Sequence, residues 1–251
     1  MDPLKYFNFF RYVPTVEEYF RFSAEKQLPK TTEIVSGRVV SDSNRSFLKG
    51  TLRREKISRR KIAKRRIILQ ALGRLSGVKY LGLSGSVSML NASDKDDLDI
   101  FVITSANRLW TTRLLLILFT SLLGVRRGPK DRLYRDKLCL NLFFSENNLS
   151  IPTAKRNIYV AHEILQLKTI INKSEIYEQL LWANRWVKNF FPQLAIPIQK
   201  KSLTLRKARP LPERLARWLQ LKLINRHRTT EIITDTQLWF FPDDFEKKLK
   251  L

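Results

Sequence analysis

The sequence predicts an α+β protein in which helices cover a sheet of apolar strands. In the middle of the chain, short apolar runs alternate with segments of helical periodicity, the pattern of a sheet packed against helices. Hydrophobic residues make up 43% and aromatic residues 11% of the 251 residues, which is typical of a folded chain. A chain of this length can form one large domain or a few small ones.

We divide the chain into an N-terminal module at 1–52, a central core at 53–150 and a mainly helical C-terminal region at 151–251. The first region opens with aromatic residues, and Thr15 with Glu18 forms a capping box at the start of a short helix. Two short helices followed by a small hairpin fit a winged-helix-like module. An aromatic-rich helical cap on the next region fits equally well.

The central region predicts an alternation of helices and strands. In order, these are a basic helix, a strand at 80–83, a helix at 86–91, a strand at 98–104, a helix at 109–123 and a strand at 138–144. The helix at 109–123 contains most of the uncharged run 114–125, which is shorter than the roughly twenty residues that span a membrane. We therefore expect no transmembrane segment, and we expect this helix to be buried on the back of the sheet.

The C-terminal region predicts three helices and a strand-prone tail. Thr153 is expected to cap a helix over 154–171, a second helix covers 174–190, and a third covers 211–224. The third is amphipathic, with its apolar side formed by Leu215, Trp218, Leu219 and Leu223. We expect that apolar side to pack on the protein's own domain, although basic helices of this kind also lie on RNA or on anionic lipid. The tail at 229–241 is expected to return to the body of the protein.

Two acidic residues mark the start of the strand at 98–104. Alternate residues of a strand share a face, so Asp97 and Asp99 point together. Paired carboxylates of this kind suit Mg²⁺, or Mn²⁺, with water and phosphate oxygens completing the shell. The turn at Gly85 and Ser86 precedes a short helix, where backbone N–H groups and a hydroxyl can contact a phosphate. The two features together predict a site for a metal ion and a nucleoside triphosphate (NTP).

These residues resemble the motif of the DNA polymerase beta-like nucleotidyltransferase superfamily. The resemblance rests on Gly85-Ser86, a spacer of about ten residues and Asp97-Leu98-Asp99 between apolar residues, and it covers roughly 79–144. The stretches 108–113, 137–143 and 161–164 are similar to a poorly characterised bacterial branch of that superfamily. The resemblance implies a nucleotidyltransferase fold with a mixed sheet. It also implies a third carboxylate on a neighbouring strand, serving as base and metal ligand.

The run expected to carry the third carboxylate, 138–144, offers only Asn141 as a polar side chain within it. An amide can position a hydroxyl or ligate a metal, but it cannot take a proton at neutral pH. Three explanations remain open. Another acid (Glu163, Asp136 or Asp94) completes the site, one metal ion suffices, or the site binds nucleotide without turning it over.

The formal net charge of +24 predicts a polyanionic partner, and nucleic acid fits it best. The strip 45–66 holds eleven Lys and Arg residues against one acid, and Lys56, Arg60 and Lys64 recur every four residues on one helix face. We interpret these three as nucleic-acid contacts, with RNA favoured. A merely solvated helix face is the alternative.

The single cysteine, Cys139, excludes a disulfide within the chain, and the first residues carry no secretion signal, so we expect a cytoplasmic protein. Cys139 itself is expected to pack as a small apolar residue.

The sequence thus favours a metal-dependent nucleotidyltransferase that moves NMP from an NTP to a hydroxyl, with RNA as a candidate acceptor. Asp97, Asp99 and Asn141 are the expected catalytic residues, and Gly85 and Ser86 the nucleotide-binding residues. Two alternatives remain: a binding module of the same fold without activity, and a nucleotidylyltransferase that acts on a protein or a small molecule.

Overall fold

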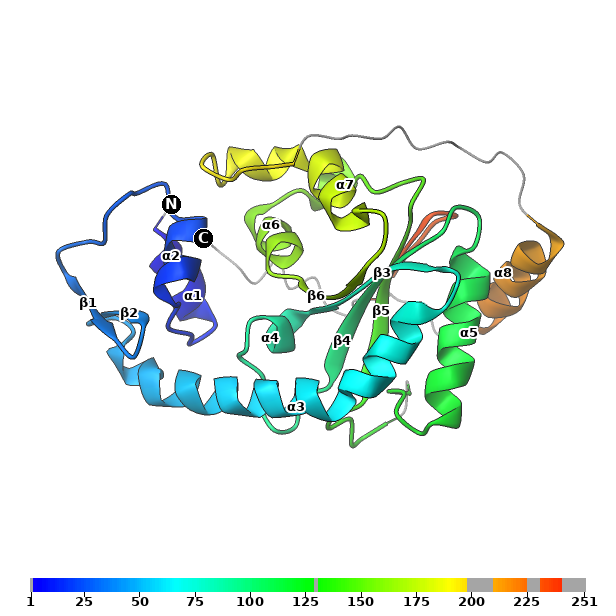
Figure 1. The fold of residues 1–251 in the computed structure, drawn as a ribbon, viewed down its shortest axis with the longest axis horizontal. Helices are drawn as coiled ribbons and strands as arrows, with labels where there is room; N and C mark the ends of the chain where they lie inside the picture. The colour runs from blue at the N-terminus through cyan, green and yellow to red at the C-terminus, as the bar shows by residue number, and fades with distance from the viewer. Residues whose placement is uncertain (1, 129–130, 198–209, 225–230, 241–251) are drawn as a thin grey trace.

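The computed structural model describes residues 2–128, 131–197, 210–224 and 231–240. Within these ranges, helices surround a six-stranded mixed sheet, and a separate two-stranded sheet lies near the N-terminus (Figure 1). The predicted α+β class with a mixed sheet is confirmed. None of the helices in the described ranges has the length and apolar character needed to cross a bilayer.

The large sheet has the strand order β6-β3-β4-β5-β8-β7. Its centre is formed by β3 (Val78–Ser84), β4 (Leu98–Thr104) and β5 (Leu138–Ser145). β4 pairs antiparallel with β3 and parallel with β5, so it lies between two strands of opposite direction. The edge strands are β6 (Lys168–Asn172) and β7 (Ile232–Ile233), and β8 (Gln237–Trp239) joins β7 to β5.

The N-terminal segment forms α1 (Pro3–Phe9), α2 (Val16–Phe22) and the hairpin of β1 (Thr32–Val35) with β2 (Arg38–Ser41). The capping box of Thr15 and Glu18 is present at the start of α2. The rings of Tyr6 and Phe7 lie in the same core cluster as Tyr80 of the large sheet. The N-terminal helices therefore share a hydrophobic core with the large sheet.

A single turn, η1 (Arg45–Phe47), leads into α3 (Leu48–Arg74), the long helix that runs from the N-terminal hairpin to the sheet (Figure 1). On one face of the sheet, α3 and α5 (Leu109–Leu122) pack against Leu83 and Ile100. On the other face, Tyr80 and Phe101 pack against α6 (Ile158–Leu165) and α7 (Ile176–Ala183). Because side chains of a strand alternate between faces, β4 contributes to both cores.

Two predicted helices of the C-terminal region are wrong in extent. The helix expected over 154–171 is a turn, η2 (Thr153–Lys155), followed by α6, and Asn157 rather than Thr153 caps α6. Residues 168–172, predicted to be helical, are instead β6 on the edge of the sheet, paired with β3. The helix expected over 174–190 ends at Ala183 and continues as η3 (Arg185–Asn189).

The expected burial of two apolar helix faces is also wrong. On α5, the side chains of Leu115, Leu118, Phe119 and Leu122 are exposed, although the opposite side of the helix packs on the sheet. On α8 (Leu211–Ile224), the apolar side predicted to pack on the domain points into solvent. The polar residues Glu213 and Gln220 are buried instead.

Candidate functional site

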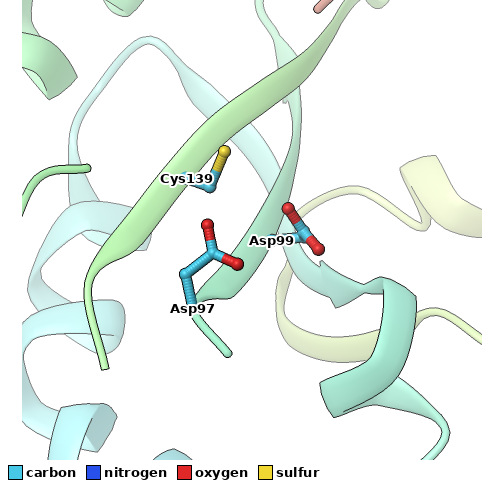
Figure 2. Close-up of side chains that lie close together, drawn as sticks. All are labelled: Asp97, Asp99 and Cys139. Atoms are coloured by element: carbon cyan, nitrogen blue, oxygen red, sulfur yellow. The ribbon is translucent and has the colours of Figure 1, made fainter. Parts of the chain in front are cut away.

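The acidic pair lies at the beginning of β4, directly beside the turn that ends β3. Asp99 is opposite Ser84 in the antiparallel register of the two strands, and Gly85 follows Ser84. Asp97 precedes the strand by one residue and shares the face of Asp99. The sequence prediction that the acids lie beside the Gly-Ser turn agrees with the contact of Gly85 with Asp99, and Figure 2 shows Asp97 and Asp99 close together.

The turn brings the backbone of Gly85 against the Asp99 carboxylate. Gly85 has a φ of +62°, and a Cβ atom at this position would lie 2.7 Å from Oδ2 of Asp99. Only glycine combines this backbone conformation with this contact at little cost. The helix that follows, α4 (Gly85–Ser88), is a single turn.

The loop that carries Asp97 is held by α3. The ammonium group of Lys61 is buried and donates to the carbonyl oxygens of Asp94 (2.9 Å) and Asp96 (2.7 Å) and to the carboxylate of Asp136 (2.8 Å). The carboxylate of Asp96 accepts hydrogen bonds from the backbone and the hydroxyl of Ser93. The position of Asp97 is therefore fixed by bonds on both sides of the loop.

The carboxylates of the pair have different partners. Asp97 accepts a hydrogen bond of 2.6 Å from the guanidinium of Arg127, and Asp99 accepts one of 2.8 Å from the side-chain amide of Asn141. Burial, together with the negative charges of Asp97 and Glu163, raises the pKa of Asp99 to about 7. A cation placed between these groups would relieve that repulsion.

Cys139 lies in parallel register with Asp99 on the neighbouring strand, and its side chain lies close to the acidic pair (Figure 2). Ligand atoms of Asp97, Asp99 and Cys139 lie within 4.8 Å of one another. Burial, together with the nearby carboxylates, raises the pKa of the Cys139 thiol well above its ordinary value, so it stays protonated. The expectation that Cys139 is only a packing residue missed this position beside the acids.

A register shift between β4 and β5 explains why two residues of β5 approach Asp99. Ile100 is opposite Leu140, but Phe101 is opposite Leu142, so Asn141 is the extra residue of a bulge. Its Nδ2 donates to Asp99, which leaves Oδ1 buried and without a hydrogen-bond partner among the described residues. This oxygen is available to a cation or a hydroxyl.

Of the three acids considered as a replacement for the third carboxylate, only Glu163 lies near the pair. The backbone N–H of Gly85 donates to Glu163, and burial raises the pKa of Glu163 to about 7. Asp136 is bound instead by Lys61 and Lys64, and Asp94 by Arg60 and Arg135. The N–H of Gly85, expected to be open to a phosphate, thus has a carboxylate partner.

Of the remaining predicted residues, Ser86, Arg60 and Lys64 have protein partners. Ser86 Oγ donates weakly, at 3.3 Å, to the carboxylate of Asp96. On α3, Arg60 and Lys64 pair with Asp94 and Asp136, so much of their charge is balanced within the protein. Lys56 is exposed. The basic face therefore lies beside the loop of the acidic pair, with one of its three cations facing solvent without a described salt bridge.

Arg127 is a residue of the site that the sequence motifs do not mark. The only signal for its role is its place in the Arg126-Arg127 pair after Gly124, because the distance in sequence to Asp97 is 30 residues. Its guanidinium also lies 4.4 Å from the ring centre of Tyr134, which orients it toward the acids. This side chain balances the charge of Asp97.

The donor set fits a hard divalent cation. Two carboxylates and the free Oδ1 of Asn141 are oxygen ligands, which Mg²⁺ and Mn²⁺ prefer, whereas the protonated Cys139 thiol is a poor ligand for them.

Comparisons of the chain with protein-family models, with curated proteins and with solved structures gave no match.

Proposed function

We propose that this protein is a metal-dependent nucleotidyltransferase that moves NMP from an NTP to a hydroxyl acceptor, with RNA as the acceptor. The observation that carries the proposal is the convergence of Asp97 and Asp99 beside the glycine turn at Gly85. This arrangement matches the motif by which the sequence resembles polymerase beta-like nucleotidyltransferases.

Asp97, Asp99 and Oδ1 of Asn141 would hold Mg²⁺ or Mn²⁺. The metal, when bound, supplies charge neutralisation for the triphosphate and the transition state. Because Gly85 has no side chain, a phosphate could approach the backbone of the turn beside the acids. Ser86 has a hydroxyl one residue further along the turn. Arg127 donates to Asp97, and its guanidinium would be available to bind a phosphate oxygen of the nucleotide if a cation took its place beside Asp97.

Glu163 is the best candidate to accept the proton of the attacking hydroxyl. Its pKa of about 7 divides it between the acid and the base near neutrality, the range in which a general base works well. It approaches the pair from α6 rather than from β5. The superfamily's usual strand position is occupied here by Cys139 and Asn141, which cannot serve as bases.

A nucleotide-binding protein without turnover is the second candidate. The observation in its favour is the same substitution on β5, where a protonated thiol and an amide stand in place of a carboxylate. The positive charge supports an RNA partner under both candidates, since the strip on α3 lies next to the acidic loop.

The test is incubation of the purified protein with each labelled NTP, Mg²⁺ or Mn²⁺, and total cellular RNA. Nucleotidyl transfer predicts labelled RNA and released pyrophosphate, both lost in the variant Asp97→Asn/Asp99→Asn. Asp42→Asn, which also neutralises a carboxylate but lies at an exposed position just after β2, is the matched control and should retain activity. If wild type binds NTP but releases no pyrophosphate with any NTP, the binding-module candidate holds instead.

A steep loss of RNA affinity with salt would identify phosphate contacts. Lys56→Glu should reduce that affinity more than Arg60→Glu, because Arg60 is already paired with Asp94. If label appeared on a co-purified protein or a small molecule and not on RNA, RNA would be excluded as the acceptor. Nucleotidyl transfer itself would still be supported.

A further inference from the structure

Helix α8 is packed with its polar side inward. Glu213, only 2% exposed, accepts hydrogen bonds from the backbone N–H groups of Trp110 (2.8 Å) and Thr111 (2.9 Å) and so caps the N-terminus of α5. About two turns further along α8, the side chain of Gln220 accepts a hydrogen bond from the guanidinium of Arg113 at 2.6 Å and donates one to the carbonyl oxygen of Trp110 at 2.8 Å. These bonds fix the rotation of α8 about its own axis.

With that rotation fixed, α8 turns its large apolar side chains outward. The neighbouring helix α5 does the same on the side away from the sheet, and the two helices lie side by side at one end of the molecule (Figure 1). We call these residues the outer apolar face: Leu115, Leu118, Phe119 and Leu122 of α5, and Leu211, Leu215, Trp218, Leu219 and Leu223 of α8, all exposed. Exposed groups of this size mark an interaction site.

Every exposed charge within α5 and α8 is positive, and Arg217 of α8 pairs with Asp235 in the turn between β7 and β8. The only acidic residue within α5 and α8 is the buried Glu213, so neither helix presents a carboxylate to solvent. Arg214 and Lys222 are exposed on α8, and Lys222 Nζ lies 5.6 Å from the ring centre of Trp218. Leucines and a tryptophan flanked by cations are the composition of helices that lie in a membrane interface.

We propose that the outer apolar face docks this protein on an anionic lipid surface. Apolar side chains would enter the boundary between headgroups and acyl chains, while Arg214 and Lys222 contact the phosphates. A second copy of the chain is a poorer occupant, since two chains of net charge +24 repel each other. RNA is poorer too, because aliphatic side chains gain little from a phosphate backbone.

Flotation of the full-length protein with vesicles tests the proposal. We expect binding to phosphatidylglycerol/phosphatidylcholine vesicles and little to phosphatidylcholine alone, with a blue shift of tryptophan emission that Trp218→Leu removes. Leu215→Ser/Leu219→Ser and, separately, Leu118→Ser/Leu122→Ser should each weaken binding by about tenfold or more. Arg214→Glu/Lys222→Glu should weaken binding to the anionic vesicles only.

The matched control is Ile67→Ser/Leu133→Ser, which changes two side chains, 82% and 84% exposed, outside the outer apolar face. It should bind vesicles like wild type, and thermal unfolding checks that all variants fold. Vesicle binding that survives both serine pairs would mean attraction by net charge alone and would overturn the proposal. Absence of vesicle binding would also overturn it. If the protein binds no vesicles but self-associates, and the serine pairs abolish this self-association, the outer apolar face is instead an interface with a second copy of the chain.

Discussion

The backbone of Gly85 and the carboxylate of Asp99 are in such close contact that a methyl group at position 85 would lie 2.7 Å from Asp99 Oδ2. The contact ties the end of β3 to the beginning of β4 at the point where the acidic pair projects. Room for a cation beside Asp99 therefore depends on the absence of a side chain on the facing turn.

Gly85→Ala should displace Asp99 and abolish binding of Mn²⁺, measured by calorimetry, as well as any nucleotidyl transfer. The left-handed backbone alone costs about 1 kcal/mol for a non-glycine residue. Gly124→Ala is the matched control, because Gly124 has a φ of +64° but no atom within 4 Å of an added Cβ. It should lose the same backbone free energy in thermal unfolding and keep the metal site. Equal metal affinity in the two variants would contradict the steric argument.

Asp99→Asn should stabilise the protein without metal more than Asp97→Asn does. Asp99 is buried near the negative charges of Asp97 and Glu163, so its neutralisation should raise the free energy of unfolding by on the order of 1 kcal/mol. Asp97→Asn relieves the same repulsion between the two acids but also removes the ion pair with Arg127, which offsets about 0.5 kcal/mol of the gain.

Both variants should lose the stabilisation that Mg²⁺ gives to wild type in thermal unfolding. Retained stabilisation in both would mean that the acidic pair is not the metal site. A fall in stability in Asp99→Asn would contradict the repulsion.

The central strands and the acidic pair could be predicted because their signals are local. Alternation of apolar residues fixed the face of β4, and the same period of two placed Asp97 and Asp99 together. The turn at Gly85 was recognisable from its neighbours in sequence.

The inverted packing of α8 could not be predicted, because its cause is distant in sequence. The apolar pattern favoured burial of Trp218 and its leucines, but Glu213 reaches backbone groups more than a hundred residues away. The helix predicted at 168–172 was wrong for a similar reason, since these residues form a strand by pairing with the edge of β3. The approach of Glu163 to Gly85 likewise depends on how α6 packs on the sheet.

Arg127→Gln should raise the affinity of the protein for Mn²⁺ alone by about threefold, because the guanidinium no longer competes for Asp97. The same variant should raise the KM for NTP, if Arg127 moves to the phosphates when the metal binds. Calorimetry and steady-state kinetics check the two effects separately. Arg126→Gln is the control, since the side chain of Arg126 has no described ion pair. A fall in Mn²⁺ affinity would contradict this competition and would mean that Arg127 holds the Asp97 carboxylate in position.

Lys61→Met should lower the free energy of unfolding by about 3 kcal/mol, because it leaves two loop carbonyl groups without their donor and leaves Lys64 as the remaining ammonium partner of the Asp136 carboxylate. Chemical denaturation measures the loss. Lys64→Met is the control, since its ammonium group is exposed and contacts Asp136 alone, and it should cost much less. Equal losses of unfolding free energy in the two variants would contradict the prediction that the buried bonds of Lys61 stabilise the fold more than the exposed bond of Lys64.

Asp136 also predicts a fall in stability in acid. Burial alone would raise its pKa, but hydrogen bonds from Lys61 and Lys64 hold it at about 2, below the ordinary 3.8. A carboxyl group with a lowered pKa stabilises the fold above its unfolded pKa, and that stability is lost as pH falls from about 4 to about 2. The loss should be on the order of 2 kcal/mol. Denaturation at several pH values should show a shallower dependence in Asp136→Asn across this window than in wild type. Asp42→Asn, at an exposed position, should keep the wild-type slope, and an unchanged slope in Asp136→Asn would contradict the assignment.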